Sequence, residues 1–93
     1  MRELKMEEFS GREGQSFELL SGERRYELTL EKVQPLPASM PGRDAFVLEW
    51  LGPYEPVLEQ AIYTFRRDDE EYEIFICPKG RDRSGVQYEA VFN

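Results

Sequence analysis

Paired carboxylates and a single cysteine are the residues of this chain whose chemistry could support catalysis. The candidate pairs are Glu55 with Glu59, and Glu49 with Glu89 across a sheet. Two neighbouring carboxylates in different environments can act as general acid and general base. However, a chain with 19 acidic residues contains such pairs by chance. We therefore assign no catalytic residue and predict that the protein is not an enzyme.

Other kinds of chemical site lack the residues that they need. The chain contains no histidine, which removes the commonest general base and the usual zinc sites. Cys77 lies in an apolar strand pattern just before Pro78, which favours an inert, half-buried thiol over a nucleophile. The acidic run 68–71 lacks the alternating ligands and the glycine of a calcium-binding loop. We predict no cofactor and no metal.

The charge and the apolar content of the chain predict which partners it avoids and where in the cell it is located. A net charge of −7 disfavours nucleic acid, whose binding depends on neutralising phosphates with Lys and Arg. The arginine clusters, at 24–25, 66–67 and 81–83, are interpreted as solvated strand ends. A lone cysteine, an acidic N-terminus and the lack of a membrane-length apolar run predict a cytoplasmic protein with no membrane contact.

Alternating apolar residues, separated by turn residues, predict a mainly β fold. The expected strands are 15–20, 24–33, 45–52, 61–67, 72–78 and 86–93, preceded by a short N-terminal helix within 3–9. About six antiparallel strands of this length fit a small barrel or a sandwich, and a single domain over 1–93. The last strand alternates up to Phe92, so we expect it to be an integral part of the sheet.

Two places are candidates for contact with a partner. The segment 34–44 holds three prolines and a glycine, which exclude regular structure, and it offers Leu36 and Met40 as exposed apolar contacts. The alternative is that it serves only as a connection. Tyr54, in a Gly-Pro-Tyr turn, is the second candidate, because exposed tyrosines favour contact surfaces. Its alternative role is to pack over one mouth of a barrel.

With these elements placed, the chain resembles a family of small uncharacterised bacterial proteins, a domain of unknown function. The resemblance covers nearly the whole chain and is most specific in the closing hexapeptide. The matching residues are Phe9, Gly14 and Phe17; Leu28-Thr29-Leu30-x-x-Val33; Phe46-x-Leu48-x-Trp50-x-Gly52-Pro53; Leu58-x-Gln60-x-x-Tyr63; Ile74-Phe75-Ile76-x-Pro78; and Tyr88-Glu89-Ala90-Val91-Phe92-Asn93.

What the resemblance implies is a type of domain rather than a reaction. Members of the family often carry a histidine and a glycine between the fourth and fifth strands, where this chain has Arg67-Asp68-Asp69-Glu70. That departure weighs against a chemical role for the histidine. The resemblance further implies an accessory or assembly role beside phage-tail-like structural proteins.

The sequence therefore predicts a non-enzymatic binding or assembly module with a protein partner, and the resemblance implies that it is an accessory of a phage-tail-like structure. The alternative is a small-molecule-binding barrel, or a small enzyme, with acidic and Tyr residues at one mouth. A binding barrel requires an internal pocket on the order of a few hundred Å³. An assembly module requires a filled core and an exposed apolar patch or an unpaired edge. The oligomeric state stays open, and a specific dimer is one possibility.

Overall fold

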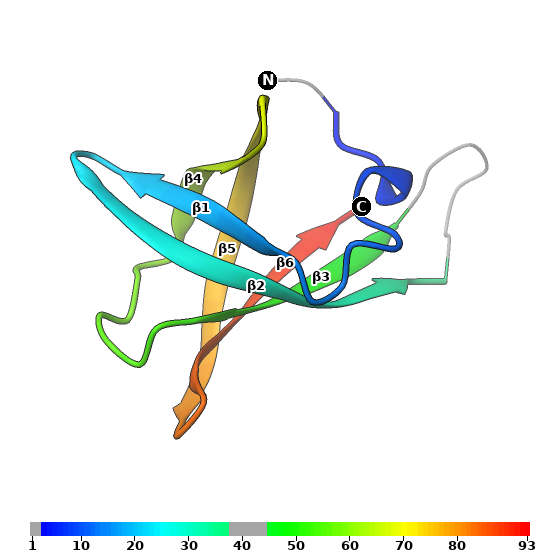
Figure 1. Cartoon of the computed structure of the whole chain (residues 1–93). Helices are drawn as coiled ribbons and strands as arrows, with labels where there is room; N and C mark the ends of the chain where they lie inside the picture. The colour runs from blue at the N-terminus through cyan, green and yellow to red at the C-terminus, as the bar shows by residue number, and fades with distance from the viewer. Residues whose placement is uncertain (1–2, 38–44) are drawn as a thin grey trace.

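The computed structural model describes residues 3–37 and 45–93. Its described part is mainly β, as predicted, and the short N-terminal helix is a single 3-10 turn rather than an α-helix. The elements are η1 (Met6–Glu8), β1 (Ser16–Ser21), β2 (Arg24–Pro35), β3 (Phe46–Gly52), β4 (Ala61–Arg67), β5 (Glu70–Asp82) and β6 (Gly85–Phe92) (Figure 1).

The six strands form one antiparallel sheet that closes on itself. Their order around the ring is β1-β2-β3-β6-β5-β4, and β4 pairs back with β1. Hairpins join β1 to β2, β4 to β5 and β5 to β6, whereas β3 inserts between β2 and β6. Inward-facing side chains from all the strands therefore share one enclosed space, as the ring of arrows in Figure 1 indicates.

Aromatic side chains fill this interior around Trp50. The indole ring meets Phe17 edge-on, with ring centroids 5.1 Å apart, and lies 4.6 Å from the ring of Phe65. Such offset and edge-to-face contacts are the preferred geometries of aromatic pairs. The largest fully buried side chains are Trp50, Tyr72, Tyr88, Phe9, Phe17, Phe46, Phe65, Leu19, Leu28, Leu30, Leu48 and Ile74.

The turn η1 brings an additional ring into this cluster. The turn is held by the Lys5 backbone N–H, which donates to a Glu8 carboxylate oxygen at 2.8 Å. Directly after it, Phe9 is fully buried and its ring lies 5.2 Å from that of Tyr72. The segment before β1 is therefore part of the core rather than a loose end.

The C-terminal strand is an integral part of the sheet, as the alternation predicts. β6 pairs with β3 from Phe46↔Phe92 to Gly52↔Val86. The rings of Phe46 and Phe92 stack at 4.5 Å with an interplanar angle of 10°. Phe92 is half-buried and packs against the core, and its backbone pairs with β3.

Gly85, at the start of β6, offers a test of this packing. Its φ of 136° is one that side chains disfavour, and an added Cβ would overlap the carbonyl oxygen of Gly52. We expect Gly85→Ala to destabilise the domain by about 2 kcal/mol or more. Urea unfolding followed by Trp50 fluorescence measures the change.

The matched control is Gly80→Ala, whose added Cβ meets only the Gln87 side chain, at 3.6 Å. It should shift the unfolding midpoint far less. Equal effects of the two substitutions would contradict the close approach of β6 to Gly52.

Candidate protein-contact surface

The segment 34–44 is described only at its two ends. The backbone N–H of Leu36 donates to the carbonyl of Ala45 at 2.8 Å, which joins the two sides of the segment at its base. The Leu36 side chain is half-buried. Met40, the other contact residue that the sequence suggests here, lies outside the described residues.

Tyr54 lies in the connection between β3 and β4 and is 51% exposed. The guanidinium of Arg81 lies 4.4 Å from the centre of its ring, which is a cation–π contact. The residue that closes this end of the core is instead Leu58, whose backbone N–H donates to the Tyr88 hydroxyl at 2.9 Å. The side chain of Tyr54 is therefore about half exposed, and Arg81 lies over its ring.

The cross-sheet carboxylate pair that the sequence suggests is brought together. Glu49 and Glu89 are register partners on β3 and β6, and both point outward. Glu89 also lies 3.5 Å from the ammonium group of Lys79. The two carboxylates border a surface depression of about 200 Å³. In the described part of the chain, no group of three His, Cys, Asp or Glu residues could hold a metal ion.

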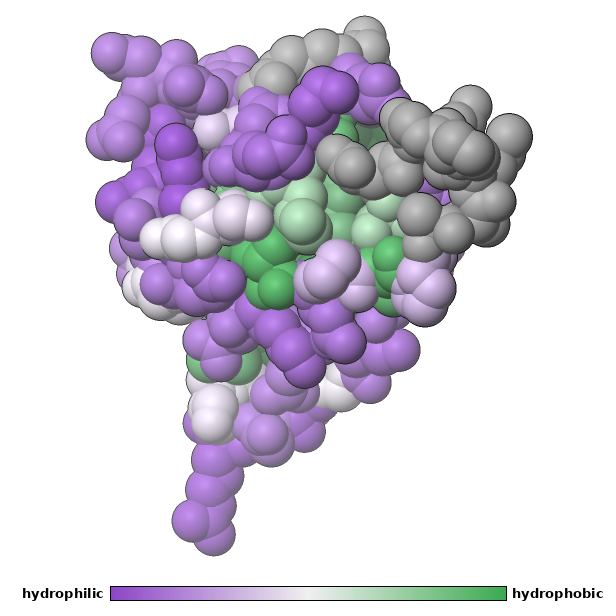
Figure 2. All heavy atoms as spheres, turned by 90° about the vertical axis from the view of Figure 1, so that its right-hand side faces the viewer, coloured by the Kyte–Doolittle hydropathy of each residue, from purple (hydrophilic) through white to green (hydrophobic). Residues whose placement is uncertain are grey.

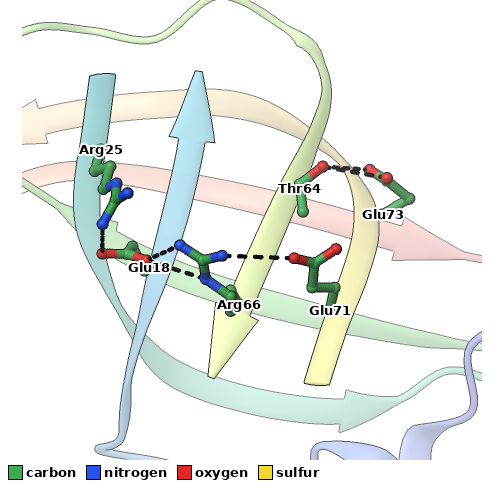
Figure 3. Close-up of polar contacts among 6 residues, drawn as sticks. All are labelled: Glu18, Arg25, Thr64, Arg66, Glu71 and Glu73. Carbon is green, nitrogen blue, oxygen red and sulfur yellow. Dashed lines mark hydrogen bonds and ion pairs between the residues drawn. The ribbon is translucent and has the colours of Figure 1, made fainter. Parts of the chain in front are cut away.

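A ladder of alternating charges crosses the outer face of four strands (Figure 3). Glu18 on β1 accepts hydrogen bonds from Arg66 on β4, at 2.9 and 3.3 Å, and lies 3.6 Å from Arg25 on β2. Arg66 also lies 3.7 Å from Glu71 on β5. The hydrogen bonds from Arg66, with a smaller contribution from the charge of Arg25, lower the pKa of Glu18.

A groove of about 460 Å³ lies against the ladder, where Glu18, Arg25 and Arg66 line it together with the core residue Phe17. Arg67 forms one wall, where it donates to the Ser16 carbonyl at 2.6 Å and lies over the Phe17 ring at 5.8 Å. The groove therefore gathers arginines from the first two sequence clusters. Its lining residues are Ser16, Phe17, Glu18, Arg25, Tyr26, Glu27, Arg66, Arg67 and Asp68.

Two apolar side chains, which the sequence reasoning did not single out, lie side by side on the outer face. Ile62 on β4 and Phe75 on β5 are register partners, exposed by 52% and 45%. We call them the β4–β5 apolar pair. The available signal was that strand 72–78 is apolar at both alternating positions, with Phe75 and Cys77 opposite the inward residues.

A second apolar area lies where β3 begins and β6 ends. Val47 and Val91 are register partners there, and Val91 is 47% exposed. Figure 2 shows this side of the molecule, with green atoms gathered in the middle and purple ones around them. No helix of the described residues is long and apolar enough to cross a membrane.

These features define a small closed-sheet β domain with a packed interior and a surface that carries both paired charges and exposed apolar groups. The chain belongs to the family described as Domain of unknown function (DUF6916), whose sequence model matches residues 4–92. No curated protein and no solved structure matches the chain.

The charge ladder predicts a pH-dependent contribution to stability. The pKa of Glu18 is lower in the folded state than its ordinary value of 4.5, so its ion pairs stabilise the fold above that value. This stabilisation is lost as the pH falls through the lower, folded-state pKa. We expect Glu18→Gln to lower the urea midpoint at neutral pH, with a difference from wild type that disappears in acid.

The control is Glu27→Gln, which changes a neighbouring exposed carboxylate that has no ion pair among the described residues. Urea midpoints measured between neutral pH and pH 3 compare the three proteins. A Glu18→Gln difference that persists unchanged at low pH would argue against the ladder.

Proposed function

We propose that this protein is a non-enzymatic binding or assembly module that contacts a protein partner through the outer face of β4 and β5. The observation that carries the proposal is the exposed, register-paired Ile62 and Phe75 on a domain whose interior is already filled. Isolated exposed apolar residues are ordinary, but two large ones side by side favour an interaction surface.

The filled interior favours this function over a small-molecule-binding barrel. Trp50 is fully buried at the centre of the ring and contacts the buried rings of both Phe17 and Phe65. The larger concavity is lined by ion-paired side chains such as Glu18 and Arg25, and the core residue at its wall, Phe17, is only 1% exposed. A ligand of ordinary size needs an enclosed apolar pocket that converges on a few polar groups.

The mouth that holds acidic and Tyr residues gives equally little support to a small enzyme. Leu58 is nearly buried there, and its backbone N–H donates a hydrogen bond to the hydroxyl oxygen of Tyr88. The hydroxyl of Tyr63 donates to the Glu59 carbonyl at 2.7 Å. Burial raises the pKa of both tyrosines, which disfavours their use as bases near neutral pH.

The nature of the partner rests on the family resemblance. Small bacterial proteins that end in Tyr-Glu-Ala-Val-Phe-Asn are expected to act beside phage-tail-like structural proteins, and we propose such a protein as the partner, met in the cytoplasm. The charge ladder argues against nucleic acid, because Arg25 and Arg66 are both engaged by Glu18 and have less charge to offer a phosphate.

An affinity capture from the source bacterium tests the function. The wild-type protein, tagged at its N-terminus, should retain a protein in stoichiometric amount, identified by mass spectrometry. The double variant Ile62→Thr, Phe75→Thr should lose most of it, because truncating apolar groups at the centre of a contact typically costs more than about 1 kcal/mol of binding. Circular dichroism confirms that the variant is folded.

The matched control is Val91→Thr, which alters an equally exposed apolar residue that lies on β6 and pairs with Val47 of β3. It should retain the partner. Loss of the partner with Val91→Thr but not with the double variant would move the contact to β3 and β6. Capture of nothing by the folded wild-type protein would count against the proposed function.

A further inference from the structure

A carboxylate that lacks a cation borders the β4–β5 apolar pair. Glu73 points outward on β5, two residues before Phe75, and it accepts hydrogen bonds from the Thr64 hydroxyl at 3.0 and 3.1 Å (Figure 3). The Glu73 carboxylate forms no ion pair within residues 3–37 and 45–93.

The basic groups of the neighbouring outward positions are already engaged. Arg66, on the same outer face, lies between Glu18 and Glu71. Lys79, further along β5, lies 3.5 Å from Glu89. The surface around Ile62 and Phe75 therefore keeps an excess of negative charge, in a chain whose net charge is −7.

From this arrangement we infer that the partner presents apolar side chains flanked by lysine or arginine. The inference rests on the proposed function and specifies the chemistry of the same surface. Apolar contact with Ile62 and Phe75 supplies affinity, whereas Glu73 steers and selects a basic surface. Hydrogen bonding by Thr64 fixes the Glu73 carboxylate next to Phe75, so that less side-chain entropy is lost on binding.

The same charges disfavour the two other occupants of an exposed apolar face. In a twofold-symmetric dimer each patch meets a copy of itself, so the acidic borders of the two copies would face one another. Like charges placed opposite each other across an interface cost binding energy. An anionic membrane surface attracts basic segments and repels acidic ones.

Binding of two synthetic peptides tests the inference directly. In one short peptide valine alternates with lysine, and in the other valine alternates with glutamate. We expect fluorescence anisotropy to show binding of the lysine peptide alone. The double variant Ile62→Thr, Phe75→Thr should weaken that binding about tenfold or more, because it removes the apolar centre of the contact.

The matched charge variants are Glu73→Gln and Glu31→Gln. Both remove one negative charge from an exposed side chain, but Glu31 lies on β2, which the order of strands in the ring separates from β4 by β1 and from β5 by β3 and β6. Glu73→Gln should weaken the lysine peptide roughly two- to fivefold at low salt, and Glu31→Gln clearly less. Equal effects of the two would show only attraction to net charge and would overturn the inference.

Two further results separate this inference from the proposed function. A concentration-dependent dimer of the protein alone, seen in sedimentation and abolished by Phe75→Thr, would assign the face to a second copy and overturn the inference. Capture of the partner from cells could be lost with Phe75→Thr and yet be unchanged by Glu73→Gln and by salt. That result would support the proposed binding function and contradict the inference that the partner is basic. If capture depends on neither residue, the proposed surface itself fails.

Discussion

Closure of the sheet between β1 and β4 is the constraint on which the rest of the structure depends. β1 pairs with β2 along its whole length, but in the described part of the chain it pairs with β4 only through residues 18–20. The inward pair at this junction, Leu19 and Phe65, is fully buried, so opening it would expose the centre of the core. The outward pair, Glu18 and Arg66, is the centre of the charge ladder. The short junction between β1 and β4 is therefore stabilised on both faces of the sheet.

Strand alternation allowed most of the fold to be predicted, because each strand of a closed sheet has one buried face. The largest difference is β5, which continues to Asp82 although the sequence pattern ends it at Pro78. A register shift between Pro78 and Gly80 absorbs the proline, and pairing with β6 resumes beyond it. Gly80, which follows the predicted end of this strand, belongs instead to an irregularity within the β5–β6 hairpin.

The candidate surface was less predictable, because it depends on which strands become neighbours. The pairing of Glu49 with Glu89 could be proposed from alternation alone, and the structure brings the two together. The ladder joins residues about fifty positions apart, such as Glu18 and Arg66, and no local pattern encodes that register. Phe75, at an outward position of β5, stays exposed although the sheet closes.

The outer face of β4 and β5 divides into rows of different character. Arg66 with Glu71 is ionic, Thr64 with Glu73 is hydrogen-bonded, and Ile62 with Phe75 is apolar. Arg66 of the ionic row also forms an ion pair with Glu18 on β1, and this contact helps to close the ring. The apolar row stays about half exposed, because it lies on the face of the sheet that points away from the filled core. The same two strands can therefore hold the domain closed at one end and leave a surface for another protein at the other.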